Sequence, residues 1–124
     1  MTGVQTCALP IGGNEQVILC ERGVRGFEQF TRFTMDVAAI PVIQRLSHLP
    51  IIADPSHSTG KWYLVTPVAL AAVAAGAHGL LIEVHPNPDI AKCDGPQSLT
   101  FANFSALMEQ VHAVAGVRKV PAQV

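Results

Sequence analysis

The sequence predicts an α/β fold in which helices alternate with the strands of a parallel sheet. Three short, β-prone apolar segments read as its strands, at 16–21, 51–53 and 79–84, and a helical pattern follows each of them. Their nearly continuous apolar character is typical of strands that are covered on both faces. Acidic, basic or histidine side chains also follow each strand. In α/β barrels, the active-site residues lie at these carboxyl ends of the strands.

The elements of the first half follow in order. Strand 16–21 begins after a glycine pair and gives way at Gly23 to a polar loop over 24–34. Asp36 is a suitable N-cap or first-turn acid for a helix whose apolar positions continue to Leu46. Pro50 ends that region and introduces the second strand.

The second half repeats the pattern. A loop over 55–63 precedes an alanine-rich helix over 66–75, with Pro67 in its first turn and Gly76 as its stop. Strand 79–84 leads into a polar loop over 86–98. Thr100 then caps a last helix whose apolar residues recur at helical spacing.

The number of strands limits the interpretation. Three strands cannot close an eight-stranded barrel, which takes about 250 residues. The chain is therefore either a small open α/β domain or part of a larger barrel. Residues 1–11 resemble the translation of a sequencing-adapter read-through, which favours the second reading; an ordinary tail is the alternative. We expect a non-native segment over 1–11, part of a barrel domain over 12–115 and a frayed tail over 116–124.

Composition excludes several classes of function. The net charge is −1 and the sequence has no lysine- or arginine-rich block, so neither nucleic acid nor an anionic membrane is an expected partner. The longest apolar run, 65–77, is interrupted by polar residues, proline and glycine and is too short to cross a bilayer. Three cysteines at irregular spacing suit a reducing cytoplasm better than a disulfide framework.

The strand ends suggest a metal site. The ends of parallel strands converge, so His57 and Glu83 should lie close together, with Asp94 in the loop after the same strand as Glu83. One imidazole and two carboxylates suit Mn²⁺, Fe²⁺, Co²⁺ or Zn²⁺. Arg22, at the first strand's end, has the fork geometry for phosphate or carboxylate. Together they indicate an anionic carbonyl or phosphorylated substrate.

Five ordered motifs extend this interpretation: Cys20-Glu-Arg-Gly23, Asp54-Pro-Ser-His-Ser-Thr-Gly60, Ala75-Gly-Ala-His-Gly79, Glu83-Val-His-Pro86 and Asp94-Gly-Pro-Gln-Ser-Leu99. In this order and spacing they resemble the 3-deoxy-D-arabino-heptulosonate 7-phosphate (DAHP) synthases, in the shorter bacterial type related to the 3-deoxy-D-manno-octulosonate 8-phosphate (KDO8P) synthases. The resemblance covers about 12–111. It implies that the chain is the C-terminal three βα units of a (β/α)8 TIM barrel, an incomplete barrel.

The resemblance also implies a function. Such enzymes condense phosphoenolpyruvate with erythrose 4-phosphate in the first step of the shikimate pathway. By motif, His57, Glu83 and Asp94 are expected to be ligands of a divalent metal, with His57 and Asp94 in the catalytic machinery, and Arg22 a contact to the phosphate of phosphoenolpyruvate. His85 is a candidate to support a metal ligand from behind. The complete enzyme is expected to be a cytoplasmic homo-oligomer.

The sequence departs from the family pattern in ways that leave alternatives open. The family's fourth ligand is a cysteine on the first barrel strand, and neither Cys20 nor Cys93 stands in a matching motif. The Lys-Pro-Arg-Thr segment that holds both substrates is not found, so we expect this chain alone to be inactive. KDO8P synthase, which carries Lys-Ala-Asn-Arg instead, and a non-catalytic α/β module are the rival functions. The loop cations Arg25 and Lys61 could meet phosphates or remain solvated.

Overall fold

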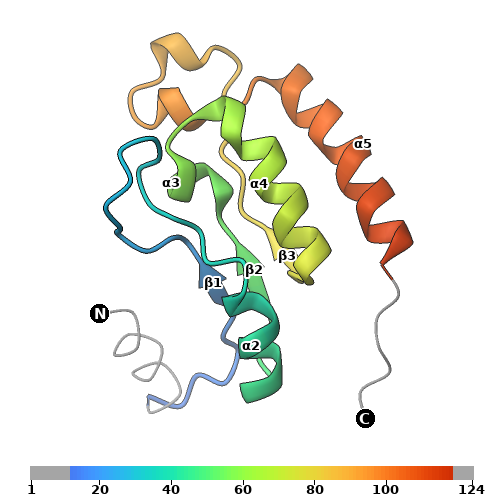
Figure 1. Ribbon diagram of the computed structural model, residues 1–124. Coiled ribbons are helices and arrows are strands. Elements are labelled where there is room, and N and C mark those ends of the chain that lie inside the picture. Colours follow the sequence, from blue (N-terminus) through green and yellow to red (C-terminus); the bar gives the residue numbers. More distant parts are fainter. Residues whose placement is uncertain (1–11, 119–124) are drawn as a thin grey trace.

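A computed structural model describes residues 12–118, which form a parallel sheet covered by helices (Figure 1). Strands β1 (Leu19–Glu21), β2 (Ile51–Ala53) and β3 (Gly79–Leu80) lie in the order β1-β2-β3, and both neighbouring pairs are parallel. The predicted α/β class with a three-stranded parallel sheet is therefore confirmed. The expected non-native segment, 1–11, and positions 119–124 of the expected tail lie outside the described residues.

In the described part of the chain, four α-helices connect and follow the strands: α2 (Ala39–Leu46), α3 (Pro55–Thr59), α4 (Trp62–Ala75) and α5 (Phe101–Val117). Two predicted helix ends are confirmed. The Thr100 hydroxyl accepts a hydrogen bond from the Asn103 backbone N–H at 3.2 Å, and Gly76 ends α4 with a φ of 111°. Asp36 supports the start of α2 from just outside it, because its carboxylate accepts from two backbone N–H groups there while Ala38 is the N-cap.

Two predicted boundaries around α4 are wrong. The expected loop over 55–63 contains α3, and α4 begins at Trp62 rather than at residue 66. Pro67 consequently lies inside α4 rather than in its first turn. A proline there removes one backbone hydrogen bond, which would have gone to the carbonyl of Tyr63. Val65 is fully buried, and its packing holds the early turns of α4 in place despite the proline.

The last strand is shorter than predicted, and the last helix is longer. β3 covers only Gly79–Leu80, because the three-residue strand β2 offers it only Ile52 and Ala53 as partners. The loop that follows contains two 3-10 turns, η1 (Pro88–Ile90) and η2 (Gly95–Gln97). Helix α5 continues to Val117, so it includes the first two positions of the expected tail.

The core lies where α4 faces the sheet and α5. One buried cluster joins the sheet to α2 and α4, and its buried members are Ile40, Ile51, Ala53 and Ala72. A second cluster joins α4 to α5 and to the loop before α5, and its buried members are Val65, Ala69, Leu99 and Leu107. Alanines at the contacts let α4 lie close to both neighbours. This packing fixes the carboxyl ends of the strands beneath α3 and the loop of η1 and η2 (Figure 1).

No helix among the described residues, 12–118, is both long enough and apolar enough to cross a membrane.

Candidate metal centre

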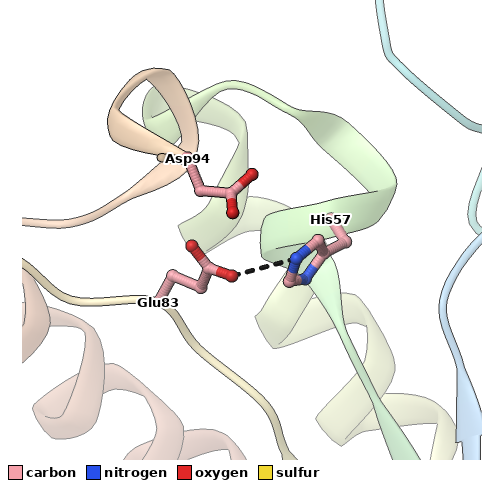
Figure 2. Close-up of side chains that lie close together, drawn as sticks. All are labelled: His57, Glu83 and Asp94. Carbon is pink, nitrogen blue, oxygen red and sulfur yellow. Dashed lines mark ion pairs between the residues drawn. The ribbon is translucent and has the colours of Figure 1, made fainter. Parts of the chain in front are cut away.

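Three predicted site residues meet above the carboxyl edge of the sheet (Figure 2). His57 lies in α3, Glu83 follows β3, and Asp94 is the N-cap of η2. One nitrogen of the imidazole and one oxygen of each carboxylate all lie within 4.8 Å of one another. The structure therefore brings together the imidazole and the two carboxylates that were predicted from the strand ends.

The short helix α3 delivers His57 to this point. Asp54 directly follows β2 and caps α3, because its Oδ1 accepts from the backbone N–H of His57 at 2.9 Å. Pro55 occupies the first helical position, where its missing N–H costs nothing. Gly60 ends the helix in the left-handed region with a φ of 67°. Five helical residues thus turn the chain sharply and leave His57 at the strand's end.

Carboxylates face both nitrogens of the His57 ring. Nδ1 lies 2.7 Å from Asp54 Oδ2, and Nε2 lies 2.9 Å from Glu83 Oε1. A neutral imidazole has one donor and one acceptor nitrogen, so it cannot donate to both carboxylates. If Nδ1 donates to the buried Asp54, the lone pair of Nε2 faces the Glu83 carboxylate, and a cation must lie between them. Either a proton or a metal ion would satisfy this geometry.

Backbone contacts position the two other members of the cluster. The Glu83 N–H donates to the hydroxyl of Ser56 at 3.0 Å, and the Glu83 carbonyl accepts from the N–H of Leu99 at 2.9 Å. Asp94 has a φ of 56°, the one positive φ of a non-glycine residue among those described. Its carbonyl accepts from Ser98 N–H and Oγ, which holds this strained turn in place. Strain of this kind is typical of functional sites.

The spacing of the donor atoms fits a metal ion. Two ligands about 2.1 Å from one ion lie about 3 Å apart at a right angle and about 3.4 Å apart at a tetrahedral angle. The separation of 2.9 Å between His57 Nε2 and Glu83 Oε1 falls near these values. Asp94 would need only a small approach, since all donor atoms already lie within 4.8 Å. One nitrogen and two oxygens are ligands that Mn²⁺, Fe²⁺, Co²⁺ and Zn²⁺ accept.

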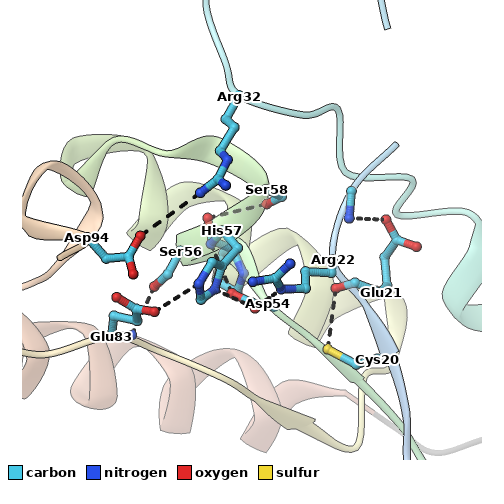
Figure 3. A network of polar contacts seen from close by, with 12 residues as sticks. Cys20, Glu21, Arg22, Arg32, Asp54, Ser56, His57, Ser58, Glu83 and Asp94 are labelled. Atoms are coloured by element: carbon cyan, nitrogen blue, oxygen red, sulfur yellow. Dashed lines mark hydrogen bonds and ion pairs between the residues drawn. The ribbon is translucent and has the colours of Figure 1, made fainter. Parts of the chain in front are cut away.

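The charges around the cluster also favour a cation. Three carboxylates, those of Asp54, Glu83 and Asp94, surround His57, and two guanidinium groups contact them (Figure 3). Negative charge is therefore in excess before the imidazole is counted. A bound divalent ion would offset that excess at short range, where the interaction is least screened.

Arg22 joins this group through Asp54. Its Nε donates to Asp54 Oδ2 at 3.2 Å, and its side chain is 52% exposed while that of Asp54 is fully buried. The outer part of the guanidinium thus remains open to an anion. Asp54 was not predicted as a site residue, although an acid three residues before a histidine at a strand end was the available signal. Asp54 caps α3, accepts from or pairs with the His57 ring, and binds the Nε of Arg22.

Two further residues differ in their relation to the cluster. Arg32, which was not predicted from the sequence, reaches Asp94 with Nη1 at 4.0 Å from Oδ1 (Figure 3). His85, the candidate support for a metal ligand, instead accepts at Nδ1 from the backbone N–H of Asn87 at 3.1 Å. Among residues 12–118, no hydrogen bond or ion pair joins the His85 side chain to the three clustered side chains.

The two described cysteines, Cys20 and Cys93, lie outside the cluster. Desolvation raises the pKa of the Cys20 thiol, the nearby Asp54 carboxylate raises it further, and Arg22 opposes the shift. A raised thiol pKa disfavours the thiolate that metal binding needs. Cys93 is a free, exposed thiol on the loop of Asp94.

Two pockets of about 850 and 440 Å³ border Asp94, so the cluster can be reached from solvent. Both volumes lie in the range of small-molecule sites. The arrangement can hold a cation next to Arg22, whose outer guanidinium nitrogens are open to solvent, within reach of a small ligand.

Comparisons with known proteins identify relatives of this chain. The chain is 52% identical over 103 residues to the phospho-2-dehydro-3-deoxyheptonate aldolase of Thermotoga maritima, covering 83% of this chain and 30% of that protein. It is 39% identical over 116 residues to the 2-dehydro-3-deoxyphosphooctonate aldolase of Cronobacter sakazakii, covering 83% of this chain and 40% of that protein. The chain thus spans well under half the length of these relatives.

Solved structures give the same relationship. The crystal structure of the Thermotoga maritima phospho-2-dehydro-3-deoxyheptonate aldolase (DAHP synthase) superposes with a TM-score of 0.88 at 48% identity, over 91% of this chain and 33% of the other. A truncated form of the 3-deoxy-D-arabino-heptulosonate 7-phosphate synthase from the same organism gives 0.82 at 50% identity, over 89% and 43%. The sequence model of the DAHP synthetase I family matches residues 1–117. This chain therefore belongs to the DAHP synthetase I family.

Proposed function

We propose that this chain is the C-terminal part of a (β/α)8 synthase that condenses phosphoenolpyruvate with erythrose 4-phosphate. Residues 12–115 would supply its last three βα units. The 52% identity with the Thermotoga maritima aldolase supports the activity. Support for an incomplete barrel comes from the sheet order, in which β1 and β3 each have one strand neighbour among the described residues. Ile18 and Leu81, beside those outer strands, are 62% and 47% exposed.

The observation that carries the proposal is the cluster at the carboxyl edge of the sheet. His57, Glu83 and Asp94 would hold one divalent cation, Mn²⁺, Fe²⁺, Co²⁺ or Zn²⁺, with Nε2 of His57 as the nitrogen ligand. Such an ion, when bound, polarises a carbonyl oxygen as a Lewis acid. Asp54 would keep the proton of His57 on Nδ1 and the ring in its orientation.

The remaining roles follow from charge and position. Arg22 would hold the phosphate of phosphoenolpyruvate with its outer nitrogens, since its Nε is engaged by Asp54. In the condensation, the enol carbon attacks the aldehyde carbon of erythrose 4-phosphate. Water adds at the adjacent carbon, and inorganic phosphate leaves by cleavage of its C–O bond. Asp94, beside both pockets, would orient a sugar hydroxyl or the water.

Related proposals have weaker support. The octulosonate reaction, which uses arabinose 5-phosphate, is favoured less because that relative is 39% identical. A non-catalytic module would not need an imidazole and two carboxylates held together. The free thiols Cys20 and Cys93 are compatible with the proposed cytoplasmic location. We also propose that complete chains associate into a homo-oligomer. His85 would support a metal ligand from behind.

A chimera tests the proposal. Residues 12–124 are joined to the part of the Thermotoga maritima enzyme that precedes the matched segment, and phosphoenolpyruvate consumption is measured with Mn²⁺ and either erythrose 4-phosphate or arabinose 5-phosphate. We expect turnover with erythrose 4-phosphate and little with arabinose 5-phosphate. Preference for arabinose 5-phosphate would reassign the substrate. A folded, metal-loaded chimera without turnover on either sugar would reject the enzymatic role. The chain alone, assayed in parallel, is expected to be inactive.

A further inference from the structure

A second pocket adjoins the metal cluster, with a volume of about 440 Å³. The loop before α2, the end of α3 and the turn of η2 line it. Asp94 belongs both to this lining and to the cluster, and Figure 3 shows Arg32 pointing toward it. Its lining includes two cations, Arg32 and Lys61. Neither the metal cluster nor the role of Arg22 accounts for these residues.

Arg32 is held in place by backbone contacts rather than by a strong ion pair. Its N–H donates to the Thr59 carbonyl at 3.1 Å, and its side chain lies against Gly60, where an added Cβ would come 2.9 Å from Arg32 Cβ. The one carboxylate near its guanidinium among the described residues, Asp94, is 4.0 Å away, which is too long for a hydrogen bond. Arg32 therefore presents unused donors to the pocket.

Lys61 brings a second positive feature, because it is the N-cap of α4. No side chain among residues 12–118 caps this helix of 14 residues. The first N–H groups of an uncapped helix carry partial positive charge and form a common binding site for phosphate. The ammonium group of Lys61 forms no salt bridge within the described part of the chain.

Gln97 supplies the independent observation that points to a ligand. The residue is 3% exposed and lines the pocket, yet its Nε2 is buried with no hydrogen-bond partner among the described residues. An amide left unpaired in this way is costly, and such groups in folded proteins usually meet an ion, a water or a ligand. Nε2 can only donate, so its missing partner is an acceptor.

We propose that Arg32, Lys61 and Gln97, with the N-terminus of α4, form an anion subsite for the phosphate group of a small molecule. Two cations, an amide donor and a helix N-terminus match a phosphate, which only accepts when fully ionised. Asp94 would repel the phosphate and accept from a hydroxyl of the same molecule. That the rest of the molecule extends toward the cluster rests on the proposed function; the phosphate subsite itself does not.

The test titrates inorganic phosphate into the whole chain without metal, by calorimetry, and compares R32M, K61M and Q97M with R25M. Arg25 is an exposed cation of the same loop that does not line the pocket. R32M and Q97M are each expected to weaken phosphate binding roughly tenfold or more, and K61M several-fold, because each loses a donor to a charged group. R25M should remain within about twofold of the parent.

Two further readouts distinguish phosphate bound in this pocket from phosphate bound elsewhere on the chain. Phosphate should shift the side-chain amide resonances of Gln97 in the unmodified chain, so the inference does not depend on Q97M folding. R22M should leave those shifts in place, because Arg22 belongs to a different contact. Unchanged affinity in R32M and Q97M, resonances of Gln97 that do not move, or loss of all binding in R22M would each overturn the subsite. An inactive chimera would reject the proposed function without affecting any of these results.

Discussion

The role of Asp54 gives the sharpest test of how the metal centre is built. Asp54→Asn keeps an oxygen that can accept from the His57 N–H, so the cap of α3 is retained, since Asn caps helices as well as Asp. The substituted amide cannot satisfy both His57 Nδ1–H and Arg22 Nε–H, which now share Oδ2 at 2.7 and 3.2 Å. His57 thus loses the partner that fixes its proton and its orientation.

The magnitude follows from the lost contact. A hydrogen bond to a charged group is worth about 1.5–3 kcal/mol, which corresponds to about a tenfold to hundredfold change in affinity. Loss of a carboxylate behind a metal-binding histidine has effects of the same size. The assay is the free Mn²⁺ signal in electron paramagnetic resonance during titration of the chain, with circular dichroism to verify the fold. We expect D54N to bind Mn²⁺ at least about tenfold more weakly than the parent.

Asp36→Asn is the matched control. Asp36 also accepts from backbone N–H groups at a helix start, but it is exposed and contacts neither His57 nor Arg22. The Mn²⁺ affinity of the Asp36→Asn variant should remain within about twofold of that of the parent chain. Parental Mn²⁺ affinity in a well-folded D54N would refute the idea that Asp54 orients the metal ligand.

Three other predictions concern ligands, backbone and thiol chemistry. Glu83→Gln should weaken Mn²⁺ binding by roughly tenfold or more, because it removes one of the proposed ligands. Its free energy of unfolding in urea should change little, because a 28% exposed carboxylate contributes little to folding. Mn²⁺ affinity equal to that of the parent would remove Glu83 from the ligand set. Gly23→Ala should lower the free energy of unfolding by about 1–3 kcal/mol, since Gly23 has a φ of 96° and an added Cβ would lie 2.7 Å from Phe33 Cβ. Gly116→Ala is its control: none of the described atoms outside α5 lies within 4 Å of an added Cβ at this position, so urea unfolding should show a gain of about 0.5–1 kcal/mol. Because its pKa is raised, Cys20 should be alkylated by iodoacetamide more slowly at about pH 8–9 in the folded chain than in urea, and the protection should fade as pH rises through the folded pKa; equal rates would contradict the shift.

The fold could be predicted where one local signal decided an element. Thr100 indicated the start of α5 and Gly76 the end of α4, because a hydroxyl cap and a left-handed glycine act within one turn of chain. The predicted start of α4 was wrong because Pro67 was expected in the first turn, whereas burial of Val65 and Ala69 stabilises the helix on both sides of the proline. Helix α3 is too short to show periodicity, so only its cap and proline could have revealed it.

The site residues that could be predicted are those at strand ends or in recognised motifs. His57, Glu83 and Asp94 were expected together because parallel strands end at one edge, and the structure places them so. Asp54 was recognised as part of a motif but without a role, since its contacts with His57 and Arg22 depend on the geometry of α3. Arg32 lies on a loop, and nothing in its local sequence distinguishes it from a solvated cation.

The single measurement closest to the central claim is the position of the metal. Crystals of the chain grown with Zn²⁺ would be measured at the zinc absorption edge, and an anomalous difference map calculated. We expect one strong peak about 2.0–2.2 Å from Nε2 of His57 and from a carboxylate oxygen of both Glu83 and Asp94. A zinc peak bound elsewhere, with these three side chains left without metal, would contradict the proposed metal centre.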